Sequence, residues 1–158
     1  MISEEVKKTL EQGFSAETQA SNLYCFFARK AEDEVSFAPS NEVADLLKEA
    51  AALFRQTAEE EAVHAYIHLA AMDGIGDTMQ NLQKASAMET FEYETIFPSA
   101  AIALQIDGNQ RVASQLDAIS LAEKRHAELF DQLLKRLSES WLNQRLTLVS
   151  QNDTALGR

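Results

Sequence analysis

Hydrophobic residues recur every three or four positions along four long stretches of the chain, at about residues 3–34, 40–73, 78–107 and 112–137. This spacing places them on one face of an α-helix. Pro98 falls inside the third stretch and should kink it, because proline has no amide hydrogen to donate. The pattern therefore predicts an all-α chain of four helices.

The ends of these stretches carry ordinary helix-boundary residues. Ser3 and Ser40 can cap the first two helices, and Gly108 ends the third. The link at about residues 73–78 is short, and its length alone allows either a tight hairpin or a stretched crossover. Residues 138–158 depart from the pattern, with Ser138 expected to begin a short C-terminal helix and the polar end expected to be disordered. We therefore expect a bundle over residues 1–137, followed by this short helix and tail.

Each hydrophobic stripe contains an acidic residue near its middle. In the second and fourth stretches a histidine follows three positions later, about 60° around the helix, so that both side chains can reach one metal ion. Buried carboxylates must either take up protons or bind cations. Facing helices of a four-helix bundle build two-metal sites from such residues. The predicted ligands are Glu17, Glu61, His64, Glu89, Glu92, Glu123 and His126.

Carboxylate and imidazole ligands suit iron or manganese better than copper. Zinc can occupy such a site after purification. His68 lies one turn beyond His64 but has no glutamate three positions before it, which favours a core or supporting role over ligation. Tyr24 and Tyr93 can pack as bundle aromatics or donate to a ligand carboxylate. Cys25 is expected to pack in the core.

The net charge of the chain limits the classes of partner that it is expected to bind. A net charge of −11 argues against nucleic acid or an anionic membrane surface. The apolar runs are shorter than a membrane span, and the N-terminus lacks the apolar segment of a signal peptide. One cysteine leaves no internal disulfide, which fits a reducing cytoplasm.

The ligand motifs and their surroundings resemble the rubrerythrins over about residues 3–137. The matching segments are Ala16-Glu-Thr-Gln-Ala20, Glu61-Ala-Val-His-Ala65, Gly74-Ile-Gly-Asp-Thr78, Glu89-Thr-Phe-Glu92 and Ala122-Glu-Lys-Arg-His-Ala127. The resemblance implies a ferritin-like antiparallel four-helix bundle with a crossover between helices two and three. It also implies a di-iron centre that reduces hydrogen peroxide to water, in which His64 and Glu92 exchange as ligands to one iron.

This sequence departs from the family pattern in three places. Rubrerythrins proper carry a rubredoxin domain with four cysteines, whereas Cys25 is the one cysteine here, so the chain resembles the stand-alone erythrin type. Such a protein needs electrons from a separate donor protein. The family's usual glycine before Glu89 is Met88, and its usual tyrosine before the proline is Phe97. Both changes alter the wall of the expected site.

The leading hypothesis is a cytoplasmic, homodimeric di-iron peroxidase that serves in oxidative-stress defence. Glu17 and His126 would be terminal ligands, and either Glu61 with Glu123 or Glu61 with Glu89 would bridge the metals. The alternative is a ferroxidase or iron-handling protein that uses oxygen instead of peroxide. A third reading is a metal-stabilised bundle without catalytic activity.

Overall fold

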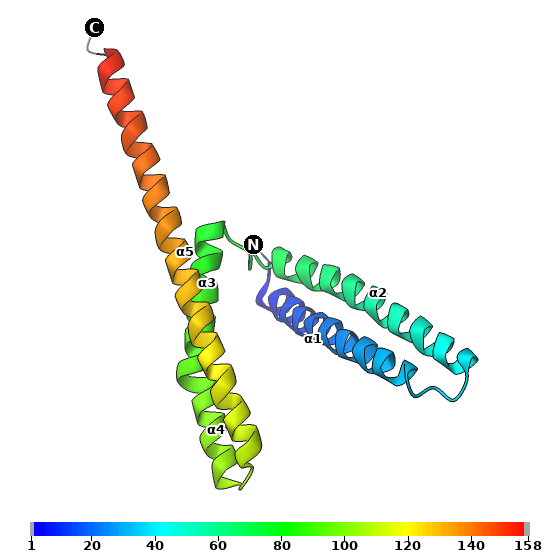
Figure 1. Ribbon diagram of the computed structural model, residues 1–158. Helices are drawn as coiled ribbons and strands as arrows, with labels where there is room; N and C mark the ends of the chain where they lie inside the picture. Colours follow the sequence, from blue (N-terminus) through cyan, green and yellow to red (C-terminus); the bar gives the residue numbers. More distant parts are fainter. Residues whose placement is uncertain (1, 157–158) are drawn as a thin grey trace. The chain divides into compact units, whose positions relative to one another are not determined.

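The computed structural model describes the backbone of residues 2–156 and the side chains of residues 2–143. The described chain is helical and contains no strand (Figure 1). It divides into two compact units, Met1–Ile75 and Gly76–Arg158, each built around a helical hairpin. Within the described residues, no helix has an apolar stretch of the length needed to cross a bilayer.

The first unit contains α1 (Glu4–Val35) and α2 (Asn41–Ala71). Ser3 and Ser40 cap the two helices, with their hydroxyl oxygens accepting amide hydrogens of the first turns at 3.2 and 3.3 Å. Each cap satisfies one of the amide groups that a helix leaves unpaired at its start. The predicted starts of both helices are therefore confirmed.

Small residues form the contact between α1 and α2. The Ser21 hydroxyl crosses it to donate to the Ala58 carbonyl at 2.9 Å, which is possible only where two helices approach closely. The buried residues among those described in this unit are all alanines: Ala28, Ala31, Ala51, Ala58 and Ala65. Larger apolar residues of the hairpin remain partly exposed, because two helices alone cannot enclose them.

The second unit contains α3 (Thr78–Phe91), the π-helical segment η1 (Glu92–Ile96), α4 (Phe97–Ile106) and α5 (Gln110–Leu156). Asp77 caps α3 through a reciprocal capping box with Gln80. Gly108 has a φ of 76°, which lets the chain turn sharply between α4 and α5.

Pro98 explains the π-helical segment. The Phe97 amide donates to the Glu92 carbonyl, five residues back, and Pro98 has no amide hydrogen to donate to Tyr93. The Tyr93 carbonyl therefore cannot receive the amide hydrogen that the same i+5 pattern would bring to it. The Ser120 hydroxyl of α5 donates to it at 3.1 Å. The kink predicted at Pro98 thus takes the form of a π turn held by the neighbouring helix.

The separate C-terminal helix predicted to begin at Ser138 is wrong, because α5 continues without interruption to Leu156. Ser138 does not cap a helix, since its hydroxyl donates back to the Leu134 carbonyl at 2.8 Å, as a serine inside a helix does. An α-helix supplies its own backbone hydrogen bonds, so it can extend past the point where its hydrophobic pattern stops. The last residues of the predicted tail, 157–158, lie outside the described part of the chain.

The Ser120–Tyr93 bond should contribute measurably to stability. We expect Ser120→Ala to lower the free energy of unfolding by about 1–2 kcal/mol, because it leaves a part-buried carbonyl unpaired. Ser114→Ala is the matched control, since Ser114 on the same helix donates only to the exposed carbonyl of Gln110. Urea denaturation of both variants provides the measurement, and equal losses would contradict this account.

Candidate metal centre

The first unit brings together three of the predicted ligands. Glu17 comes from α1, and Glu61 and His64 come from one turn of α2. Each residue offers one ligand atom, and these atoms lie within 4.8 Å of one another. His64 Nδ1 is 3.0 Å from Glu61 Oε2. The close alanine contact between α1 and α2 is what lets a glutamate from each helix reach the same point. We call this group the first triad.

The second unit repeats the arrangement. Glu89 of α3 lies beside Glu123 and His126 of α5, again with ligand atoms within 4.8 Å of one another. His126 Nδ1 is 2.7 Å from Glu123 Oε2 and 3.6 Å from Glu89 Oε2. We call this group the second triad. Six of the seven predicted ligands therefore fall into two groups of the same composition.

The carboxyl groups within each triad perturb one another. A hydrogen bond with Glu61 raises the pKa of Glu17, with burial and the repulsion between the two acids acting in the same direction. The same bond lowers the pKa of Glu61, which indicates that the shared proton resides on Glu17. Burial, followed by a hydrogen bond with Glu123, raises the pKa of Glu89. In each triad, therefore, the closeness of two carboxyl groups favours the protonated form of one of them, Glu17 in the first and Glu89 in the second.

This arrangement fits a divalent cation. A positive ion would replace the shared proton and remove the repulsion between the paired carboxylates. The oxygen and imidazole donors present match the preferences of iron and manganese. Each unit supplies three donors, a number that leaves coordination positions for further ligands.

Glu92, the seventh predicted ligand, is not within either triad. It is half-buried and begins the π-helical segment, directly after the helix that carries Glu89. Its charge is near enough to Glu89 to raise the pKa of that carboxyl. Glu92 therefore borders the second triad from a stretch of irregular backbone. The sequence signalled the irregularity through Pro98 but did not show that it begins at Glu92.

His68 and Tyr24 pack against residues that are not candidate ligands. His68 packs its ring against the backbone at Gly13, where an added Cβ would lie 2.6 Å from the ring, and its Nδ1 is buried without a partner. Tyr24 packs its ring against Phe27 and Phe54, with ring centroids about 6 Å apart. The contact of His68 with Gly13 could not be predicted from the sequence, because a glycine gives no hydrophobic signal.

Tyr93 and Cys25 do not take part in the triads. The Tyr93 hydroxyl donates to Glu94 at 3.2 Å, an acid that lies off the predicted stripe. Cys25 is partly buried and unpaired. Neither residue is therefore needed to explain the candidate metal centre.

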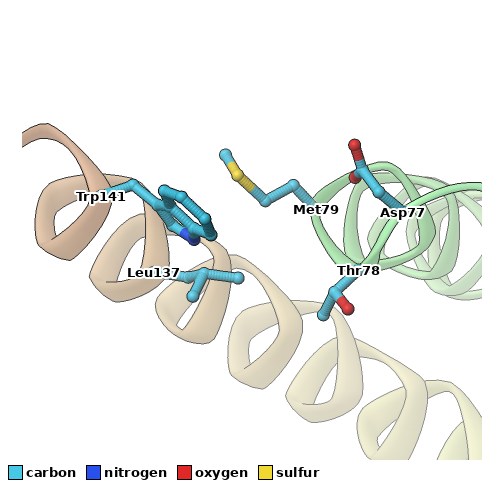
Figure 2. A pocket seen from close by; sticks show the side chains of 5 residues that line it. All are labelled: Asp77, Thr78, Met79, Leu137 and Trp141. Atoms are coloured by element: carbon cyan, nitrogen blue, oxygen red, sulfur yellow. The ribbon is translucent and has the colours of Figure 1, made fainter. Parts of the chain in front are cut away.

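A cavity of about 500 Å³ in the second unit does not overlap with the candidate ligands. It lies between the start of α3 and α5, with the Met79 and Trp141 side chains extending toward each other across it (Figure 2). Asp77, Thr78 and Leu137 complete its lining. Asp77 supplies the one carboxylate of this lining, and it already caps α3. The cavity is therefore not a candidate metal site.

Comparison with known proteins identifies the family. The family model described as rubrerythrin matches residues 8–134. Rubrerythrin-1 of Clostridium acetobutylicum is 27% identical over 150 residues, covering 84% of this chain and 71% of the relative. A putative rubrerythrin of Methanocaldococcus jannaschii is 29% identical over 157 residues, covering 85% and 72%. Rubrerythrin of Porphyromonas gingivalis is 26% identical over 152 residues, covering 88% and 70%. The chain belongs to the rubrerythrin family, whose members are helical, ferritin-like di-iron proteins.

Proposed function

We propose that the two triads together hold two iron ions and that the protein reduces hydrogen peroxide to water in oxidative-stress defence. The observation that carries the proposal is the occurrence of the same Glu–Glu–His group in both units. Two matching groups are what a two-metal centre requires, and membership of the rubrerythrin family supports the same conclusion. A separate donor protein would supply the electrons, and the proposed location is the cytoplasm.

When bound, a pair of ferrous ions supplies the two electrons that break the oxygen–oxygen bond of peroxide. With two protons the products are two water molecules, so the charge balances. The protein's own part would be to hold the ions. Glu17 and His126 would do so together with Glu61 and either Glu89 or Glu123.

Two residues are suited to a change of ligand during turnover. The side chain of His64 is 54% exposed, and the other members of both triads are partly buried, so His64 can move away without unpacking a core. Glu92 lies where the backbone departs from α-helical hydrogen bonding, which makes a small shift less costly. We propose that these two side chains exchange at one iron.

Anaerobic addition of peroxide to the ferrous protein tests the activity. We expect one peroxide to oxidise two irons, since each iron gives one electron. Glu92→Gln should slow the oxidation at least tenfold, because it removes the exchanging carboxylate. Glu94→Gln is the control, since Glu94 neighbours Glu92 in sequence but interacts with Tyr93. Iron that reacts with oxygen and not with peroxide would instead favour the ferroxidase function.

The raised pKa of Glu89 predicts how the stability of the metal-free protein depends on pH. The folded protein holds this proton more tightly than the unfolded chain, so its stabilising effect is complete below the ordinary pKa of 4.5. That effect is lost as the pH rises through the raised pKa. Glu89→Gln should therefore flatten the fall in stability above pH 4.5. Urea denaturation in chelator at several pH values gives the measurement.

A second acid on α5 serves as the comparison for this pH experiment. Glu128 lies off the hydrophobic stripe and outside both triads. Glu128→Gln should leave the slope of stability against pH as it is in the unaltered protein. A Glu89→Gln slope equal to that of Glu128→Gln would show that the Glu89 proton does not contribute.

A further inference from the structure

His68 has a ring nitrogen that the packing of the first unit does not use. Its Nδ1 is buried and has no hydrogen-bond partner. Such atoms are uncommon in folded proteins because they cost free energy, and where they occur they often belong to a site that a ligand or ion completes. His68 lies four residues after His64, so the two imidazoles project from successive turns of one face of α2. The unused nitrogen therefore belongs to the surroundings of the first triad.

Gly13 on α1 makes room for this ring. A Cβ added at Gly13 would lie 2.6 Å from Cε1 of His68, 2.8 Å from Nε2 and 3.0 Å from Nδ1. These three atoms form the nitrogen-bearing edge of the imidazole, so this edge faces α1. A side chain at position 13 would displace the ring, because real Cβ atoms essentially never make such short contacts. The glycine therefore admits both ring nitrogens to the surface of α1.

The candidate ligand Glu17 lies one turn after Gly13 on the same face of α1. Side chains on an α-helix lean toward its N-terminus, so the Glu17 carboxyl leans back toward the level of Gly13. The ring of His68 on the antiparallel helix α2 leans the opposite way, toward the turn of His64 (Figure 1). The hydrogen bond with Glu61 has the largest effect on the pKa of Glu17 and raises it, whereas positive charge on His64 or His68 lowers it. His68 and Glu17 are therefore close enough to influence each other.

The state of Glu17 explains why His68 lacks a partner in the metal-free protein. There the Glu17 carboxyl is engaged in its hydrogen bond with Glu61. A divalent cation would displace the shared proton and leave Glu17 as a carboxylate with an oxygen free to accept a hydrogen bond. Carboxylates that bind metals in proteins are commonly held by such an additional bond. The His68 imidazole can supply it and stay neutral, with its one hydrogen on Nδ1 in place of Nε2.

We propose that His68 is a positioning residue for Glu17, and that its Nδ1–H donates to the Glu17 carboxylate when a divalent cation occupies the first triad. The second triad differs at the corresponding position, where Phe130 follows His126 at the same spacing and has no hydrogen to donate. This hydrogen bond therefore distinguishes the first triad from the second. The inference rests on the proposed metal centre, but its tests use Zn²⁺ and not peroxide.

Titration calorimetry with Zn²⁺ tests the proposal on each triad separately. Glu123→Ala with His126→Ala disables the second triad, so that binding reports on the first. In this background His68→Leu, which removes both ring nitrogens at similar size, should weaken Zn²⁺ binding about tenfold or more, as the loss of a hydrogen bond to a metal ligand usually does. Unchanged affinity would overturn the proposal.

The reciprocal background is the matched control. With Glu61→Ala and His64→Ala, only the second triad is left to bind, and His68→Leu should not alter its affinity for Zn²⁺. An equal loss in both backgrounds would overturn the proposal, because it would show a general effect on the fold.

Two further measurements separate positioning from packing. Because Nδ1 has no partner without metal, His68→Leu should not lower the free energy of unfolding in chelator. His68→Asn, whose side-chain amide can donate from near the place of Nδ1, should recover part of the lost Zn²⁺ affinity. A loss of stability in chelator as large as the loss in Zn²⁺ binding would show that the ring acts by packing. No recovery in His68→Asn would show the same, and either result would overturn the proposal.

Nitrogen-15 NMR of the histidine rings observes the hydrogen itself in the unaltered protein, with the His68 signals identified by their absence in His68→Leu. We expect the hydrogen on Nε2 in chelator, because a buried N–H without an acceptor is costly, and on Nδ1 after saturation with Zn²⁺. A hydrogen on Nε2 with Zn²⁺ bound would overturn the proposal. An unaltered protein that binds no Zn²⁺ would overturn both this inference and the proposed metal centre. Zn²⁺ binding as expected, in a protein whose ferrous form does not react with peroxide, would contradict only the proposed function.

Discussion

The repulsion between paired carboxyl groups is the constraint on which the rest of this protein depends. Glu17 and Glu61 meet across the α1–α2 contact, and Glu89 and Glu123 meet across the α3–α5 contact, close enough to share a proton. Two negative charges at such a distance are destabilising in a partly apolar setting unless a proton or a cation lies between them. The sequence places them there twice. An arrangement that is unfavourable for an empty protein is favourable for one that binds metal.

Small residues at the helix contacts make this proximity possible. Alanines line the interface of the first hairpin, and Ser21 hydrogen-bonds directly to the Ala58 backbone. Larger side chains at these positions would separate the helices and move the two glutamates apart. The use of alanine at these positions also leaves the hairpin without a core of its own, because alanine buries little apolar area. The contact that assembles a triad therefore also creates the need for a second hairpin.

Much of this organisation could be predicted from sequence, because the ligands interrupt hydrophobic stripes at helical spacing. The helix caps at Ser3 and Ser40 could also be predicted from the sequence, because each cap satisfies backbone amides close to it in the chain. The continuation of α5 past Ser138 could not, because the backbone hydrogen bonds of a helix persist where its packing pattern ends.

The π-helical segment connects the irregular backbone near Pro98 to the predicted ligand Glu92. Pro98 removes one backbone donor, the effect extends back to Glu92, and Ser120 on another helix repairs the loss. The one predicted ligand that lies outside the triads is thus followed directly by Tyr93, whose carbonyl accepts a hydrogen bond from a side chain of α5. A regular helix would fix Glu92 in register with Glu89 on the same face. Here the irregular backbone begins at Glu92 itself, directly after the helix that carries Glu89.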